Sequence, residues 1–145
     1  MSEVIEIYTD GACSGNPGKG GWGAVLLCGH HKKEIYGFAE HTTNNQMELK
    51  ATIESLKTIK KPSEIILYTD SIYVKDGITK WIIDWKKNGW RNSRRQPVKN
   101  IDLWQELDLL ILEHKITWKW VRGHSGNKYN EIADQLAVNA IKNII

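Results

Sequence analysis

The spacing of hydrophobic and polar residues predicts strands in the first third of the chain. Residues 3–10, 21–28 and 33–40 are rich in β-branched or aromatic residues and are bounded by glycine or charged turns, which is typical of strands. The connections between them are short, so we expect an antiparallel meander. The segment 11–21 holds five glycines, which indicates a loop that can turn sharply and approach a ligand closely.

The hydrophobic period then changes to that of a helix. Leu49, Ile53 and Leu56 share one helical face, which predicts a helix over about 44–60. Residues 64–70 form a short apolar run without alternation, which is typical of a strand buried on both faces and parallel to its neighbour. Later patterns predict a helix at 71–80, a helical turn at 81–87, a helix at 101–114 capped by Asn100, a strand at 116–121 and a helix at 128–144.

This order predicts an α/β fold with a mixed five-stranded sheet flanked by helices, in which the first three strands form an antiparallel meander and the other two are parallel. The 145 residues fit a single domain, 1–145, with a basic protrusion at about 81–99. The longest apolar run, residues 24–28, is too short to span a membrane. We see no secretory signal and no C-x-x-C spacing, so a reduced, cytoplasmic protein is expected.

The net charge of +3 is unevenly distributed along the chain. Residues 80–99 hold seven basic residues and one acidic residue, a local charge of +6, so the other 125 residues sum to −3. A local positive charge of this kind favours binding to a polyanion. The alternative is a solvated charge run over a tryptophan-containing core.

Two aspartates follow the same apolar pattern at two places in the chain. Asp10 and Asp70 each end a Tyr-Thr-Asp tripeptide at the end of a predicted strand. If the two strands are parallel neighbours, the two carboxylates lie side by side and need a cation, for which Mg²⁺ is the matching ion. The alternative is that each aspartate caps the turn or helix that follows it.

Three further residues extend this acidic group. Glu48 lies in the expected first turn of its helix, where an acidic residue can also be a partner of the helix dipole. Asp134 lies beside the apolar stripe of the last helix, where a carboxylate without a partner is costly. His124 precedes that helix in a loop with two glycines and is either a proton shuttle or a surface histidine without a role.

These motifs together resemble those of the ribonuclease H type 1 family, as in the bacterial ribonuclease HI group. The resemblance runs over about residues 3–142, with the motifs in the family's order and spacing. It rests on Thr9-Asp10-Gly11, Gly15-Asn16-Pro17-Gly18, Thr43 to Leu49, Thr69-Asp70-Ser71, Gly123 to Asn127, and Asp134.

The resemblance implies hydrolysis of the RNA strand of an RNA–DNA hybrid duplex, with 5′-phosphate and 3′-hydroxyl products. It implies two Mg²⁺ ions, with Mn²⁺ as a possible substitute, held by Asp10, Glu48, Asp70 and Asp134. Asp10 would bridge both ions, and Glu48 would also reach a ribose 2′-hydroxyl. His124 would assist proton transfer or product release.

The resemblance also assigns substrate contacts. Those along the minor groove or at phosphates are Gly11, Cys13, Asn16, Thr43, Asn44, Asn45, Ser71 and Asn100, and those in the basic protrusion are Trp81, Trp85, Lys86, Lys87, Trp90, Arg94 and Arg95. We interpret Trp104, Trp118 and Trp120 as packing residues. Two positions depart from the family pattern: Leu27 where an arginine completes a phosphate pocket with Thr43 and Asn100, and Ile72 where glutamine is frequent.

Two other functions remain open at this point. One is a different nuclease of the same superfamily, such as one directed at DNA, which the basic protrusion and Asn44-Asn45 disfavour. The other is a non-catalytic module that binds hybrids or double-stranded RNA, which the loss of a metal-ligand carboxylate would favour. All four carboxylates are present, and we expect a monomer.

Overall fold

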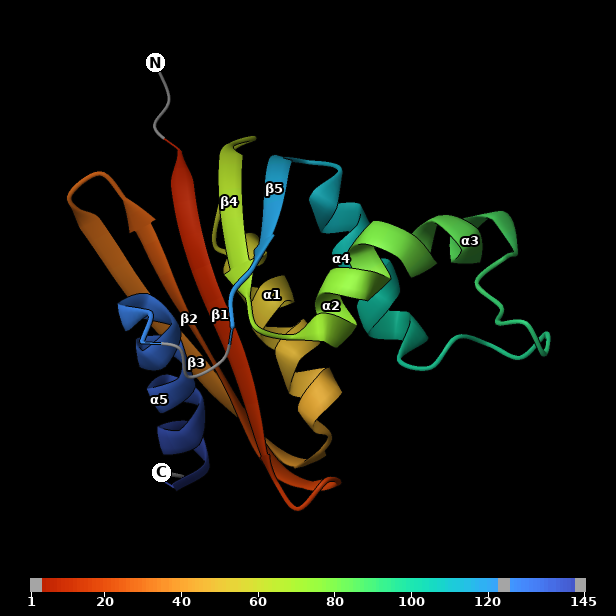
Figure 1. Cartoon of the computed structure of the whole chain (residues 1–145), viewed down its shortest axis with the longest axis horizontal. Coiled ribbons are helices and arrows are strands. Elements are labelled where there is room, and N and C mark those ends of the chain that lie inside the picture. The colour runs from red at the N-terminus through yellow and green to blue at the C-terminus, as the bar shows by residue number, and fades with distance from the viewer. Residues whose placement is uncertain (1–3, 123–125, 143–145) are drawn as a thin grey trace.

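The computed structural model describes residues 4–122 and 126–142. A central sheet lies between helices, as Figure 1 shows. The elements in chain order are β1 (Ile5–Ser14), β2 (Gly18–Cys28), β3 (His31–Thr42), α1 (Asn44–Lys57), β4 (Glu64–Thr69), α2 (Ile72–Asp76), the π-helical turn η1 (Gly77–Trp81), α3 (Ile82–Lys87), α4 (Ile101–Ile111), β5 (Lys115–Trp120) and α5 (Lys128–Lys142).

The sheet has five strands in the order β3-β2-β1-β4-β5. The β1–β2 and β2–β3 pairs are antiparallel, whereas β4 pairs in parallel with both β1 and β5. The predicted fold class is therefore confirmed, including the antiparallel meander and the two parallel strands. The three strands of the meander are longer than the sequence pattern indicated.

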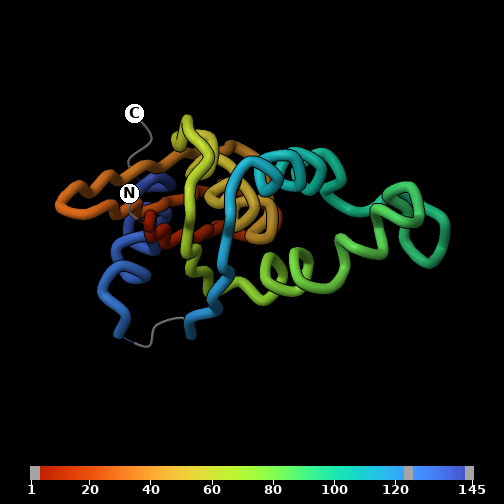
Figure 2. The backbone as a smooth tube through the Cα atoms, turned by 90° about the horizontal axis from the view of Figure 1, so that it is seen from above, coloured from red at the N-terminus to blue at the C-terminus, as the bar shows by residue number. Residues whose placement is uncertain are grey.

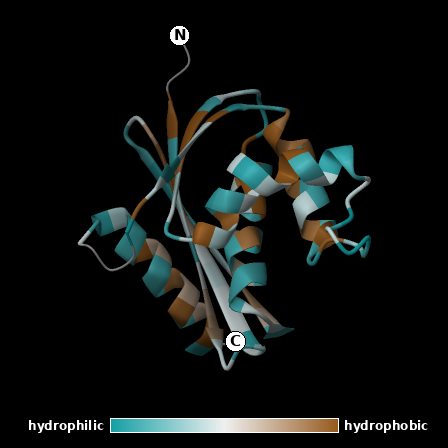
Figure 3. Cartoon of the chain, turned by 45° about the vertical axis from the view of Figure 1, so that its right-hand side comes forward, coloured by the Kyte–Doolittle hydropathy of each residue, from teal (hydrophilic) through white to brown (hydrophobic). Residues whose placement is uncertain are grey.

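Helices cover both faces of the sheet. Helix α5 packs against β1 and β2 on one face, while α1 packs against the same strands on the other face and α4 packs against α1. Apolar residues gather where these helices meet the sheet (Figure 3). Fully buried side chains in the larger core include Ile7, Leu49, Ile53, Leu56, Ile65, Leu67, Val74, Trp104 and Leu107. The helical stripe predicted from Leu49, Ile53 and Leu56 is thus confirmed.

The glycine-rich segment is mostly strand rather than the loop predicted from its composition. Pairing between β1 and β2 continues to Ser14↔Lys19, so the turn is confined to about residues 15–17. The glycines instead allow helices to approach the sheet. A Cβ at Gly11 would collide with the backbone of Glu48 in α1, and a Cβ at Gly23 would meet the side chain of Leu136 in α5.

The two helical segments predicted at 71–80 and 81–87 form one uninterrupted helical run, α2-η1-α3. The widened π turn begins at Gly77, which is buried against the six-membered ring of Trp104 in the neighbouring helix α4. The absence of a side chain at Gly77 leaves room for the indole, which is fully buried. The run therefore carries the chain away from the sheet while remaining attached to the core.

Residues 81–99, which we call the basic arm, project from the side of the molecule. Figures 1 and 2 show α3 and the loop after it extending well beyond the sheet before the chain returns to α4. Hydrophilic residues predominate along this outer loop (Figure 3). The positive charge seen in the sequence is thus carried on a separate projection.

The three tryptophans interpreted as packing residues have different environments. Trp104 is fully buried, and Trp118 packs partly against the core. Trp120 is 43% exposed, so its interpretation as a packing residue is wrong. It lies at the end of β5, which is an edge strand, and α5 packs on β1, β2 and β3 instead.

Replacement of Gly77 by alanine tests the close contact with Trp104. We expect Gly77→Ala to lower the free energy of unfolding by about 1–3 kcal/mol, because the added methyl overlaps a packed indole ring. Urea denaturation measures this change, with the exposed Thr79→Ala in the same turn as the control. Helix propensity alone predicts the opposite sign for Gly77→Ala, so an unchanged or raised free energy would refute the steric explanation.

Candidate active site

Three carboxylates from different elements meet at one place on the sheet. Asp10 lies on β1, Glu48 on α1 and Asp70 directly after β4. One ligand oxygen from each lies within 4.8 Å of the other two. The register explains the pair of aspartates, because the parallel ladder of β1 and β4 ends at Thr9↔Thr69 and the next residue on each chain is aspartate.

Asp10 differs from the prediction in its place along the strand. It lies within β1, opposite Gly23 of β2, rather than at the end of the strand. The parallel pairing of β1 with β4 ends just before Asp10. Because β4 does not pair with Asp10, there is room beside it for the Asp70 carboxylate. The antiparallel partner continues to support β1, so Asp10 is 4% exposed and held on a strand.

Glu48 is buried against β1 and lies beyond the first turn of α1. The helix begins at Asn44, and its first turn contains no acidic residue, so the dipole explanation considered for Glu48 is wrong. Thr43 and Gln46 form a capping box that fixes the start of the helix. Because Gly11 has no side chain, this helix approaches β1 closely enough to bring Glu48 to Asp10.

The electrostatics of the cluster strongly disfavour three ionised groups. Burial, followed by repulsion from Asp70 and by the hydrogen bond and charge of Asp134, raises the pKa of Asp10 to about 8. Burial, together with repulsion from Asp10 and Asp70, raises the pKa of Glu48 well above its usual value. Within the described residues, Glu48 Oε1 is buried without a hydrogen-bond partner. Carboxylate oxygens held in this way are the ligands that a hard divalent cation requires.

The predicted catalytic group has two further residues, Asp134 and His124, of which the structure describes only Asp134. Asp134 on α5 is half-buried and adjoins Asp10, since its hydrogen bond and charge both act on the Asp10 carboxyl. It is not among the three residues that share one compact set of ligand atoms. His124 lies outside the described residues.

Polar residues predicted to contact substrate surround the start of α1. The Asn16 side-chain oxygen accepts a hydrogen bond from the Asn44 backbone N–H at 2.9 Å, which joins the β1–β2 turn to the helix. Asn45 is exposed. The Cys13 thiol contacts the carbonyl oxygens of Gly15 and Thr42, each at 3.4 Å. Ser71, in contrast, is buried and caps α2 by accepting from the Val74 N–H.

A chain of hydrogen bonds that the sequence did not reveal joins Thr43 to Asn100. Gln46 accepts from the Thr43 backbone N–H and donates to Asn100 Oδ1 at 3.0 Å. Asn100 Nδ2 donates in turn to the Tyr73 hydroxyl, which also accepts from the indole of Trp104. Asn100 therefore makes no side-chain cap bond for α4, contrary to the prediction, and has a left-handed backbone with φ of 60°. Residues this distant in sequence leave no local pattern.

The structure shows where the two departures from the family pattern, Leu27 and Ile72, lie. Leu27 packs with the cluster of Tyr8, Val25 and Ala133, on the α5 face of the sheet. Thr43 and Asn100 are joined on the α1 side, so the expectation that position 27 completes a pocket with them is wrong. Ile72 is 59% exposed immediately after Ser71, so its surface position is compatible with the loss of a polar contact there.

The basic arm is built on tryptophans whose rings pack against one another at tilted angles. The rings of Trp81, Trp85 and Trp90 follow one another at centroid distances of 5.9 and 6.4 Å, and Trp85 also packs edge-on against Trp104. Lys86 forms an ion pair with Asp108 of α4 at 3.3 Å, which ties the arm to the body. Trp85, Trp90 and Lys86 therefore have structural contacts of their own, whereas Lys87, Arg94 and Arg95 are exposed.

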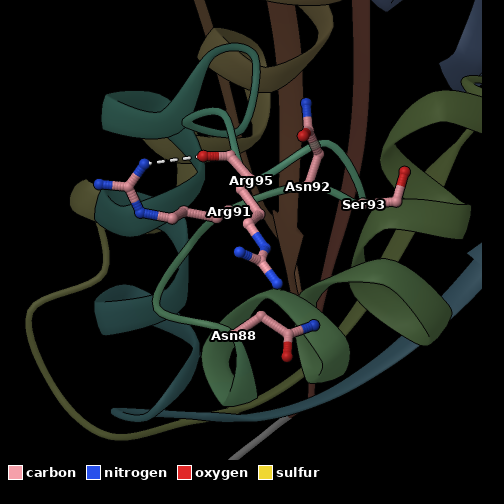
Figure 4. A pocket seen from close by; sticks show the side chains of 5 residues that line it. All are labelled: Asn88, Arg91, Asn92, Ser93 and Arg95. Carbon is pink, nitrogen blue, oxygen red and sulfur yellow. Dashed lines mark hydrogen bonds between the residues drawn. The ribbon is translucent and has the colours of Figure 1, made fainter.

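A surface pocket lies in the loop of the arm (Figure 4). It is lined by Asn88, Arg91, Asn92, Ser93 and Arg95. The Arg91 guanidinium donates to the Arg95 carbonyl oxygen at 2.9 Å, which closes the loop. Arg91 contributes to the positive charge of the arm, and the sequence pattern alone does not place it in a pocket.

Comparison with known proteins connects this site to a family. The family model for RNase H matches residues 2–142. The chain belongs to the RNase H family. It is 60% identical over 139 residues to a ribonuclease H of Wolbachia pipientis wMel, covering 96% of this chain and 95% of that relative. It is 58% identical over 143 residues to a ribonuclease H of Bradyrhizobium diazoefficiens, covering 97% and 93%.

A solved structure with a similar fold supports the same assignment. LC9-RNase H1, described as a type 1 RNase H with the type 2 active-site motif, superposes with a TM-score of 0.90 at 32% identity, over 99% of this chain and 74% of that one. The protein is therefore a nuclease of a metal-dependent hydrolase family. Among the described residues, none of the helices has the length and apolar character that crossing a membrane requires.

The raised pKa of Asp10 predicts how the stability of the metal-free nuclease changes with pH. The unfolded chain loses this proton near pH 4, whereas the folded protein keeps it to about pH 8. The folded state thus binds more protons in this window, and the free energy of unfolding falls as pH rises from about 4 to about 8. Asp10→Asn removes the penalty and should raise the free energy of unfolding at pH 8 by at least about 1.4 kcal/mol, the value of one pKa unit.

Urea denaturation in EDTA at a series of pH values checks this prediction. Glu113→Gln, an exposed acidic residue after α4, is the control. Wild type and Glu113→Gln should lose stability in parallel as the pH rises, and Asp10→Asn should lose less. An identical pH dependence in all three proteins would show that Asp10 is an ordinary ionised carboxylate.

Proposed function

We propose that the protein is an endoribonuclease that hydrolyses the RNA strand of RNA–DNA hybrids, leaving 5′-phosphate and 3′-hydroxyl ends. The observation that carries this proposal is the cluster of buried Asp10 and Glu48 with half-buried Asp70, and with Asp134 beside it, in a chain of the RNase H family. Three carboxylates in one buried site require positive charge. A cluster of this kind supports catalysis over simple binding of nucleic acid.

Asp10, Glu48, Asp70 and Asp134 would hold the metal ions, two Mg²⁺ with Mn²⁺ as a substitute. When bound, such ions supply an activated water and stabilise the leaving oxygen of an in-line displacement. Asp10, between Asp70 and Asp134, is proposed as the shared ligand. Glu48 faces the same site from α1 and is proposed to reach the ribose 2′-hydroxyl, while His124 is proposed to assist proton transfer or product release.

Recognition of a hybrid requires one strand with 2′-hydroxyls and one without them. We assign the minor-groove contacts to the β1–β2 turn and the start of α1, at Gly11, Cys13, Asn16, Asn44 and Asn45. The hydrogen bond between Asn16 and Asn44 supports this assignment because it holds the two segments together. Ser71 is a weaker candidate because its side chain is buried.

The DNA strand is proposed to follow Thr43, Asn100 and the basic arm. Thr43 Oγ1 accepts from Gln46 and keeps its own proton to donate to a phosphate. One N–H of the Asn100 amide is used by Tyr73, which leaves the second. The exposed arginines and lysines of the arm then supply the electrostatic part of the affinity, with Trp81, at 36% exposure, beside them.

Cleavage of a panel of labelled substrates tests the proposed activity. RNA–DNA hybrid, duplex RNA, duplex DNA and single-stranded RNA are incubated with Mg²⁺, with Mn²⁺ or with EDTA. We expect cleavage of the hybrid alone, in its RNA strand, that disappears in EDTA. Cleavage of duplex DNA would indicate a DNA-directed nuclease, hybrid binding without cleavage would indicate a non-catalytic module, and equal cleavage of single-stranded RNA would refute hybrid specificity.

Asp70→Asn tests the carboxylate site in the same assay. We expect more than about a 100-fold loss of cleavage, because even the outer partners of metal ligands cost about 10–100-fold when they are mutated. The control is Asp102→Asn, an exposed acidic residue of α4, which should retain full activity. Substantial activity in a folded Asp70→Asn protein would be incompatible with its assignment as a metal ligand.

Neutralisation of the arm tests its role in binding. Lys87, Arg94 and Arg95 form no side-chain ion pairs within the part of the chain that the structure describes. We expect their triple replacement by glutamine to raise KM and to flatten the dependence of log KM on log salt by roughly 2–3, since each phosphate contact contributes about 0.9 to the slope. Lys33→Gln with Lys115→Gln is the control away from the arm. An unchanged slope of log KM against log salt would show that these charges do not contact substrate, and that the arm is a solvated charge run over a tryptophan-containing core.

A further inference from the structure

Trp120 makes a contact that the proposed carboxylate roles leave unexplained. Although its side chain is exposed, its indole N–H donates to the backbone carbonyl oxygen of Asp70 at 3.2 Å. Trp120 is the last residue of β5, and Asp70 follows the last residue of β4. The indole thus bonds directly to the backbone of one of the three clustered carboxylate residues.

This bond lies immediately beyond the end of the β4–β5 pairing. The parallel pairing of β4 with β5 ends at Thr69↔Trp120, and the Val121 N–H donates to the Thr69 carbonyl at 2.9 Å. The Asp70 carbonyl lies past this last backbone bond and accepts from the indole N–H of Trp120. A side-chain bond therefore joins the ends of β4 and β5 beyond their backbone pairing.

The backbone after Asp70 is fixed as well. The Ser71 N–H donates to the Thr69 hydroxyl, and the Ser71 hydroxyl caps α2. With the Trp120 bond, Asp70 is held at its own carbonyl as well as at the residues before and after it. The indole is itself restrained, because Lys75 Nζ of α2 lies over its ring at 5.9 Å.

We propose that Trp120 is a positioning residue, whose indole N–H holds the Asp70 backbone so that its carboxylate meets those of Asp10 and Glu48 in the geometry that a divalent cation needs. This inference rests on the proposed function. The physical reason is that partners which orient metal ligands affect metal affinity even though they do not touch the ion. A displacement of about 1 Å at such a site is sufficient to slow catalysis strongly.

Two substitutions separate the N–H group from the ring. Trp120→Phe keeps an aromatic ring but removes the donor. Trp120→His restores a donor, because Nε2 of imidazole occupies the same position in a five-membered ring as Nε1 of indole. At pH 8 the imidazole is neutral, so Trp120→His and Trp120→Phe do not differ in charge.

Calorimetric titration with Mg²⁺ alone, without substrate, is the first readout. We expect Trp120→Phe to weaken Mg²⁺ binding by about 10–100-fold and Trp120→His to recover much of the loss. With hybrid substrate, kcat should fall in Trp120→Phe while KM stays unchanged. Trp118→Phe, on the same strand but packed against the core, is the matched control and should keep wild-type Mg²⁺ affinity even if it is less stable.

Three results would overturn the proposal. These are wild-type Mg²⁺ affinity in folded Trp120→Phe, a Trp120→His protein no better than Trp120→Phe, and an effect on KM alone, which would show that the ring contacts substrate. If the variants do not fold, hydrogen exchange of the indole N–H groups in the wild-type protein tests the bond. Trp81 is less exposed than Trp120, so exposure alone predicts slower exchange at Trp81. The bond predicts slower exchange at Trp120, and equal or faster exchange at Trp120 contradicts it. These results differ from a failure of the proposed function, because in that case the wild-type protein itself would bind no Mg²⁺ or cleave no hybrid.

Discussion

Mutual repulsion among buried carboxylates is the constraint on which the rest of this structure depends. Asp10, Glu48 and Asp70 are held by two strands and a helix whose positions are fixed by backbone pairing and core packing, so the three groups cannot move apart. Without a cation the cluster relieves its repulsion by holding protons, as the raised pKa of Asp10 indicates. The fold thus accepts a loss of stability at this place, which is typical of functional sites.

Several features far apart in sequence serve this arrangement. Gly11 lets α1 lie close to β1, the capping box of Thr43 and Gln46 fixes where that helix begins, and the indole of Trp120 supports the chain after β4. The positive charge that we propose holds a polyanion lies apart from this cluster, on the basic arm. Gly77 leaves the space in which Trp104 packs, and the helical run carries the arm outward from that contact. The positive and negative charges thus lie on separate parts of the molecule and do not neutralise each other.

The sequence predicted the antiparallel meander and the two parallel strands from local periodicity. It predicted the meeting of the acidic residues from the repeated Tyr-Thr-Asp tripeptide and from the resemblance to a known family. It did not predict that β1 continues past Asp10, since the glycines that suggested a loop are required by helices packed across the sheet. The network of Gln46, Asn100 and Tyr73 and the exposure of Trp120 depend on tertiary contacts that leave no trace in neighbouring residues. The position of Leu27 was misjudged because the face to which a strand residue points depends on the register of the sheet.

We propose that a metal ion replaces the protons that the carboxylate cluster holds. Calorimetric titration of the wild-type protein with Mg²⁺ at pH 7, in buffers with different ionisation enthalpies, measures the number of protons released on binding. We expect proton release at pH 7, with an affinity for Mg²⁺ that increases as the pH approaches 8. Binding of Mg²⁺ without proton release and with an affinity independent of pH would contradict this account.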